Sequence, residues 1–330
     1  MSKRDNITKK YMSDPHRFAD FFNGYIYNGK EVISPNSLSE VDTAGVAVIP
    51  YFINNTSNKT GKTTKSLAVK KYRDILKKAV LMKSDKVYYL FLGIENQTDI
   101  HYAMPVRNML YDGLLYNQQI ETIAKYNRDN GICESSGEFL SGFTKNDKLI
   151  PIVTVTVYWG TKPWDAPVTL KDMLLENIDE NIASMIGDYH CNLFSIIDAE
   201  KLPKYKTELN ELFNLLRMRN DGEGMRELVE NNIAYKNIDE ETAGMMSEFA
   251  NIELPGKRKD GGYDMCKAVL DLKNEGRMEG IEEGRKEGRE ETLAEKIKVK
   301  LKKGKSIFTI VDEIEETEEY VRELIDKYNL

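Results

Sequence analysis

Residues 72–97 read YRDILKKAVLMKSDKVYYLFLGIENQ, and this stretch decides the fold. Two segments rich in apolar and β-forming residues, 72–82 and 87–95, flank the polar tetrapeptide 83–86. Two such runs separated by a short polar turn predict a β-hairpin. The first segment is also compatible with a helix, because a short apolar run does not distinguish strand from helix by periodicity alone.

The hairpin predicts which side chains face each other. A turn centred between Ser84 and Asp85 pairs positions whose numbers sum to 169, so Asp74 lies opposite Glu95. Directly opposed residues share a face of the sheet, with Cβ atoms about 4.5–5.5 Å apart. Gln97 lies on the same face as Glu95, because residues two apart in a strand point the same way. A loop with an odd number of residues would move the two carboxylates to opposite faces.

This pair of carboxylates suggests a chemistry. Two neighbouring carboxylates repel each other unless a positive charge joins them. Mg²⁺ serves this purpose well, because it binds oxygen ligands and keeps several of its waters. A metal held in this way activates a bound water and polarises a phosphoryl oxygen, which suits phosphodiester hydrolysis. The spacing of Asp74, Glu95 and Gln97 is by itself a weak pattern, and the alternative is a pair of exposed acidic residues with lysine counter-ions.

The charge around Asp74 is strongly positive, although the whole chain has a net charge of −7. Residues 59–86 contain ten basic and two acidic residues, and Lys71, Arg73 and Lys78 are our candidates for contacts with a DNA backbone. The alternative is a lysine-rich edge strand, since lysines protect exposed sheet edges. An acidic chain is not typical of nucleic-acid-binding proteins, so this local run is what favours DNA as a partner.

The rest of the chain predicts a mixed α/β region followed by helices. Residues 17–27 predict a first helix, residues 103–127 a long helix, and residues 150–159 a strong strand. Pro50 argues against a central strand over the apolar residues 45–53. From about residue 168 onward we expect mostly helix.

The C-terminal residues 263–330 predict a charged helix and a short helical pair. Glycine recurs at every fourth position from Gly276 to Gly288. Acidic residues in the terminal pair would repel phosphate, so a protein–protein contact, such as a homodimer through these helices, is the better hypothesis. The three cysteines lie too far apart for a disulfide framework or a zinc pattern. No apolar run is long enough for a membrane span and no signal peptide is evident, so we expect a cytoplasmic protein.

Three longer segments resemble a known family. They are LGIENQTDIHYAMPVRNMLYDGLLYNQQ (92–119), SGEFLSGFTKNDKLIPIVTVTVYWGTKPWDAPVTLKDML (136–174) and GDYHCNLFSI (187–196). Together they resemble the recombination-promoting nuclease and transposase family of the PD-(D/E)XK nuclease superfamily. The resemblance covers most of residues 17–200 and is weak beyond them. It implies a restriction-endonuclease-like α/β fold, with a mixed sheet flanked by helices and a helical C-terminal region.

The resemblance also implies an activity and its residues. It implies a Mg²⁺-dependent DNA endonuclease, with Mn²⁺ as a substitute metal, linked to recombination or transposon-like mobile elements. Asp74 and Glu95 would be the metal ligands, and Gln97 would complete the catalytic set where the superfamily most often has lysine. Glutamine offers only a neutral donor and acceptor, so we expect a weak hydrolase. Arg107 would contact a phosphate, and Asp20 is the candidate for an acidic residue on the first helix.

Two hypotheses about function follow. The first is a metal-dependent hydrolase that cleaves phosphodiester bonds in DNA. The alternative is a catalytically weakened DNA-binding or assembly protein with the same fold, which Gln97 and the acidic net charge favour. For the domains, we expect a nuclease-like core over 1–200, a helical subdomain over 201–262, and the charged helix with its terminal pair over 263–330.

Overall fold

The computed structural model describes residues 3–41, 44–52, 64–83, 86–199 and 201–330, without the side chains of 44–52, 64–72, 83, 86 and 273–280. Within it, the predicted hairpin is confirmed. Strands β4 (Ile75–Lys83) and β5 (Lys86–Gln97) are antiparallel, from the pair Lys83 and Lys86 to the pair Ile75 and Ile94. The numbers of each pair sum to 169, as the predicted turn requires. The helical alternative for the first segment is therefore wrong.

The hairpin lies inside a five-stranded mixed sheet. Its order is β1 (Leu38–Glu40), β4, β5, β6 (Ile152–Tyr158) and β7 (Asn192–Ser195). Strands β1, β4 and β5 pair antiparallel, whereas β5, β6 and β7 pair parallel. Parallel neighbours need a crossover connection. The predicted long helix, α3 (Met104–Asp129), supplies it between β5 and β6.

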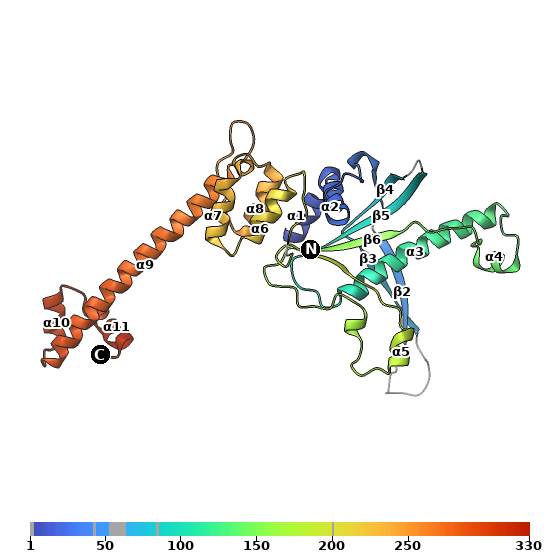
Figure 1. Cartoon of the computed structure of the whole chain (residues 1–330). Helices are drawn as coiled ribbons and strands as arrows, with labels where there is room; N and C mark the ends of the chain where they lie inside the picture. The colour runs from blue at the N-terminus through green and yellow to red at the C-terminus, as the bar shows by residue number, and fades with distance from the viewer. Residues whose placement is uncertain (1–2, 42–43, 53–63, 84–85, 200) are drawn as a thin grey trace, which may run out of the picture. The chain divides into compact units, whose positions relative to one another are not determined.

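Helices cover both faces of this sheet, and the chain has an α/β fold (Figure 1). On β6, threonines and valines alternate, so they point to opposite faces. The Asn108 side chain of α3 donates to Thr156 on the threonine face. Phe194 of β7, which pairs with Val157, stacks on the opposite face against aromatic rings of α2 (Pro15–Tyr27) and α6 (Leu209–Arg217).

A second, two-stranded sheet contains Pro50, which argued against a central strand. Strands β2 (Ala44–Phe52) and β3 (Thr64–Tyr72) are antiparallel, and Pro50 pairs with Ser66. In a two-stranded sheet each strand is an edge, so a residue without an N–H group is tolerated there. Residues 53–63, between these two strands, lie outside the described residues.

The helix predicted over 17–27 is α2, and a helix that we did not predict precedes it. Asp14 caps α2 by accepting from the backbone N–H groups of residues 16 and 17. The earlier helix, α1 (Lys3–Ser13), buries Thr8, Tyr11 and Met12. This three- and four-residue spacing is the signal by which the sequence could have predicted α1.

The chain divides into two compact units, Met1–Met265 and Cys266–Leu330. The helices of 201–262 thus belong to the same unit as the sheet, and not to the separate subdomain that we expected. The expected helices between 168 and 200 are reduced to two short ones, and the sequence analysis missed β7 there. The remaining helices of the first unit are η1 (Pro35–Ser37), α4 (Ser136–Ser141), η2 (Lys171–Met173), α5 (Glu180–Met185), α7 (Gly222–Asn231), η3 (Ile233–Lys236) and α8 (Glu240–Ala250).

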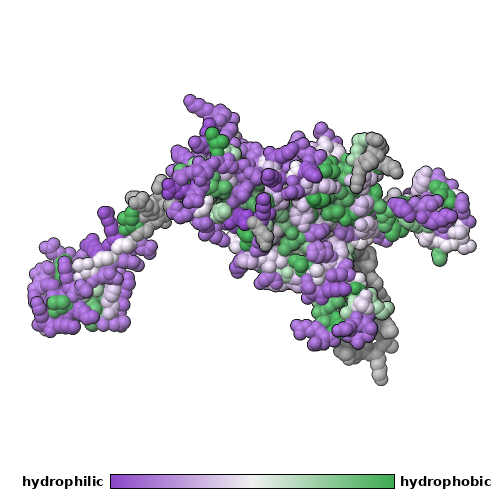
Figure 2. All heavy atoms as spheres, in the orientation of Figure 1, coloured by the Kyte–Doolittle hydropathy of each residue, from purple (hydrophilic) through white to green (hydrophobic). Residues whose placement is uncertain are grey.

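The second unit matches the prediction for the C-terminus. Helix α9 (Met265–Lys302) begins at the end of the first unit, and α10 (Ile307–Ile314) and α11 (Glu318–Tyr328) follow it. Its core consists of Leu293, Ile297, Ile310, Val321 and Leu324. The visible surface of this unit is largely hydrophilic, whereas hydrophobic residues gather over β4 and β5 in the first unit (Figure 2). No described helix is both long and apolar enough to cross a membrane.

Candidate functional site

The two predicted carboxylates meet at the end of the β4–β5 hairpin. Asp74 directly precedes β4 and is one position beyond the last ladder pair, opposite Glu95 in the register. The Asp74 Oδ2 atom accepts a hydrogen bond from the backbone N–H of Asn96, at 2.9 Å. The negative charge of Asp74 also raises the pKa of Glu95. The structure thus brings Asp74 and Glu95 together at one site.

Glu95 is the most perturbed acid of this site. Its side chain is fully buried, and burial is the main reason why its pKa rises from 4.5 to about 8. The charge of Asp74 raises that pKa further, whereas the guanidinium groups of Arg107 and Arg73 oppose the rise. Among the described residues, the Glu95 Oε1 atom has no hydrogen-bond partner. A buried, unsatisfied carboxylate oxygen costs free energy unless a proton or a cation satisfies it.

Two arginines, Arg107 and Arg73, contact Glu95 and differ in how deeply they are buried. Arg107, on α3, donates from Nη2 to Glu95 Oε2 at 3.2 Å and from Nε to the Tyr111 hydroxyl at 3.1 Å. Arg73 Nε lies 3.9 Å from Glu95 Oε1, and its side chain is only 3% exposed. A contact between Arg73 and DNA requires a solvent-facing guanidinium, so the burial of Arg73 contradicts that prediction.

Asp112 of α3 holds Arg73 in place. Its Oδ1 atom accepts from Arg73 Nη2 and from the Thr154 hydroxyl, and its Oδ2 atom accepts from the Tyr189 hydroxyl, each at 2.6 Å. Arg73 also lies close against β5, because a Cβ atom added at Gly93 would be 2.8 Å from Arg73 Nη1. Asp112 is separated by 39 residues from Arg73, so no local sequence pattern indicates this contact.

A cavity of about 300 Å³ opens beside the carboxylates. Its lining includes Asp74, Gln97 and Arg107, three of the predicted site residues, and also Asp5 of α1. Glu95 is not part of this lining; it lies behind it, in contact with Arg107. Burial raises the pKa of Asp74 as well, and the nearby Asp5 charge adds to the rise, against the backbone N–H of Asn96, Arg107 and Lys9.

Asp5 is therefore the acidic residue that the first helix brings to the site, in place of Asp20. Asp20 is buried on α2, and its Oδ2 atom accepts from the backbone N–H groups of Lys206 and Thr207 at 2.8 and 2.7 Å. It also accepts from the Thr207 hydroxyl, which makes it a structural acceptor for this loop. Asp5 replaces Asp20 as the candidate because we predicted that the first helix begins at residue 17, whereas α1 precedes it.

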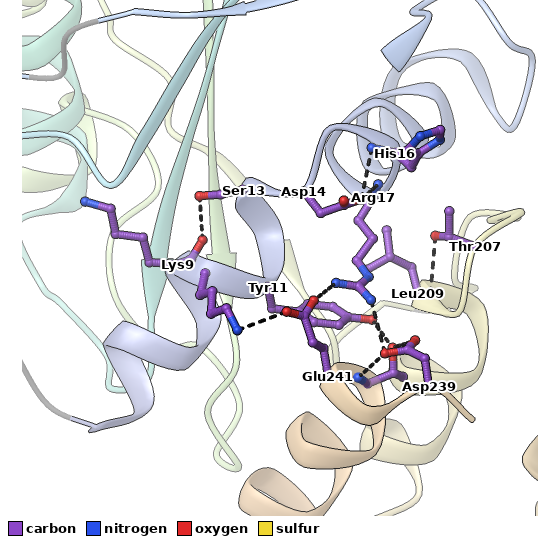
Figure 3. A network of polar contacts seen from close by, with 12 residues as sticks. Lys9, Tyr11, Ser13, Asp14, His16, Arg17, Thr207, Leu209, Asp239 and Glu241 are labelled. Atoms are coloured by element: carbon purple, nitrogen blue, oxygen red, sulfur yellow. Dashed lines mark hydrogen bonds and ion pairs between the residues drawn. The ribbon is translucent and has the colours of Figure 1, made fainter. Parts of the chain in front are cut away.

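Contacts with α2 and the start of α8 hold α1, and with it Asp5, in position (Figure 3). Arg17 of α2 donates to Glu241 at 2.6 Å and to Asp239 at 3.2 Å, both from the start of α8. The Arg17 guanidinium lies 4.2 Å from the centre of the Tyr11 ring of α1, and Tyr11 in turn shares a hydrogen bond with Thr242 of α8. The helices after residue 200 thus support the site.

The other predicted DNA contacts differ in their surroundings. Lys78 is half-buried, and its Nζ atom lies 4.0 Å from the centre of the exposed Tyr89 ring. The side chain of Lys71 lies outside the described residues. Among the described side chains of the four predicted DNA contacts, that of Arg107 lines the cavity.

The donor set fits a small, hard cation. In the described part of the chain, no three His, Cys, Asp or Glu side chains form a ready metal cage. Mg²⁺ does not require one, because proteins often hold it with one or two carboxylates plus waters and substrate phosphates. Two carboxylates of this kind are present: Asp74 lines the cavity, and the Oε1 atom of Glu95 has no hydrogen-bond partner among the described residues. Comparison of the chain with protein-family models, curated proteins and solved structures gave no significant match.

Proposed function

We propose that this chain is a Mg²⁺-dependent DNA endonuclease of the PD-(D/E)XK kind, linked to recombination or mobile elements. The observation that carries the proposal is the proximity of Asp74 and Glu95 at the end of the β4–β5 hairpin, with one Glu95 oxygen left without a hydrogen bond. Burial is the main cause that raises both pKa values, and the charge of Asp74 raises that of Glu95 further; a divalent cation would offset both effects by favouring the ionised carboxylates. The mixed sheet with its crossover helix is compatible with this class.

The residues at and beside the cavity would have different roles in the reaction. Asp74 and Glu95 would hold the metal, which supplies an activated water and neutralises charge on the phosphate. Gln97 lines the cavity and would orient that water with its neutral amide. Arg107 would contact a phosphate oxygen of the DNA backbone, since a guanidinium suits such oxygens. Asp5 and Asp99 line the same cavity and add two further acidic side chains to the approach of a cation.

A binding protein without catalysis is the second candidate. Two observations favour it: Gln97 lacks the positive charge of lysine, and two arginines already lie against Glu95. Such a protein would bind DNA or assemble with partners through the same fold. The two candidates differ in whether Asp74 and Glu95 are needed for a bond to break.

A plasmid assay separates the candidates. Purified protein with Mg²⁺ should nick or linearise supercoiled plasmid. Asp74→Asn and Glu95→Gln should each lower the cleavage rate by at least about 10-fold, because the loss of a residue that only supports a metal ligand already lowers activity about 10- to 100-fold. Asp129→Asn, an exposed change on α3, is the matched control and should keep full activity. Cleavage that survives both site changes rejects this site. DNA binding without cleavage in Mg²⁺ or Mn²⁺ supports the second candidate.

A further inference from the structure

Arg107 contacts Glu95 and also lines the cavity. Glu95 is fully buried and is absent from the cavity lining, whereas the Arg107 side chain is 24% exposed and lines it. The Arg107 Nη2 atom donates to Glu95 Oε2 at 3.2 Å. The Arg107 guanidinium is thus in contact with both the buried carboxylate and the cavity.

The two arginines on Glu95 differ in their freedom to move. Arg73 is enclosed: Asp112 accepts from it at 2.6 Å, and it fills the space beside Gly93 where a side chain would otherwise lie. Arg107 is anchored more weakly, by the hydroxyl of Tyr111 one helical turn away on α3. Its exposed part already faces the cavity, so it is the arginine that can turn away from Glu95 without breaking a buried ion pair elsewhere.

A metal ion and Arg107 compete for the same carboxylate. A divalent cation bound to Glu95 would place two positive charges within a few ångströms of each other, where like charges repel. Bound metal therefore favours release of Arg107, and by thermodynamic linkage Arg107 weakens metal binding by the same factor. The released guanidinium would lie in the cavity, where a phosphate of the substrate can replace Glu95 as its partner.

We propose that Arg107 is a displaceable internal cation that closes the site in the metal-free chain and is released when a divalent metal binds. This inference rests on the proposed metal site at Asp74 and Glu95. It assigns to Arg107 two successive partners, Glu95 and then a phosphate of the substrate. Metal binding and phosphate binding are thereby coupled through one side chain.

Arginine labelling tests the proposal directly. The full chain is treated with phenylglyoxal with and without Mg²⁺, labelled arginines are quantified by mass spectrometry, and Mg²⁺ binding is measured in parallel by calorimetry. Mg²⁺ should raise the labelling rate of Arg107 about fivefold or more, the lower end of typical coupling between sites. Arg73, which is buried, should stay protected in both states, and the exposed Arg128 of α3 should react equally in both. Glu95→Ala removes the oxygen that accepts from Arg107 Nη2, so it should leave Arg107 reactive even without Mg²⁺.

The outcomes distinguish the inference from the proposed function. If calorimetry shows Mg²⁺ binding and Arg107 labelling does not rise, the displacement is refuted, and the nuclease proposal stands on the plasmid assay. If Mg²⁺ does not bind to the chain in the absence of DNA, the displacement is refuted, and the plasmid assay alone decides the nuclease proposal. Tyr111→Phe removes the second anchor of Arg107 and provides a second variant that preserves every charge; it should raise Arg107 labelling without metal.

Discussion

The burial of Glu95 predicts an unusual dependence of stability on pH. Its pKa is raised from 4.5 to about 8 in the folded chain. Between these values the folded state binds a proton that the unfolded state has lost, so the free energy of unfolding falls as pH rises. Each pH unit costs about 1.4 kcal/mol for one proton, so the fall from pH 5 to pH 8 is about 4 kcal/mol. This is a large share of the ~5–15 kcal/mol that stabilises a typical protein.

Glu95→Gln should remove most of this fall, because the amide mimics the protonated acid at every pH. The variant and the wild-type chain should have similar stability near pH 5, and the variant should be more stable by several kcal/mol near pH 8.5. Urea unfolding followed by tryptophan fluorescence measures this, since both tryptophans, Trp159 and Trp164, lie in the first unit.

Glu121→Gln is the matched control for this experiment. Glu121 is exposed on α3, where it accepts a hydrogen bond from Asn117, so its removal should leave the pH dependence of the wild-type chain unchanged. The reasoning is refuted if Glu95→Gln retains the full wild-type fall in stability between pH 5 and pH 8.5. That result would mean that Glu95 is ionised in the folded chain at neutral pH, held by its two arginines.

Two further changes test the packing. Gly93→Ala places a Cβ atom 2.8 Å from Arg73 Nη1 and should destabilise the first unit by about 1–3 kcal/mol. Gly113→Ala on α3 places a Cβ atom with no other atom within 4 Å and should stabilise the first unit by up to about 1 kcal/mol. Urea midpoints compare the two, and equal effects would contradict the close contact at Gly93. Ile310→Ala should cost the second unit about 2–5 kcal/mol. Circular dichroism should detect that loss while the tryptophan transition stays unchanged; a shift of that transition would show that the two units unfold together.

Local patterns predicted the hairpin and most helices because short-range rules govern them. The register of β4 and β5 follows from an even turn and from strands whose side chains alternate. The helix over 17–27 begins at a capping residue, Asp14, and ends at Asn28 with a left-handed backbone. The positions of Asp74 and Glu95 depend on these local features alone, which is why the sequence placed them opposite each other.

Residues distant in the sequence decided the rest. Arg73 and Lys78 belong to the same basic run, yet Arg73 is buried by Asp112 and Gly93, and Lys78 is half-buried. A count of charges cannot separate them, because burial depends on which helix crosses the sheet at that point. The four-residue strand β7 is formed by pairing with β6 and has too few residues for a periodic signal.

The sequence by itself determined the hairpin, its register and the two facing carboxylates, because a strand turns its side chains alternately and a short turn sets the pairing. Only the tertiary structure decided what surrounds them: Asp5 enters in place of Asp20, and Arg107 lies across Glu95. The physical reason is that these neighbours come from helices whose positions are set by packing across the whole sheet. That packing is a property of the assembled core and of no single segment.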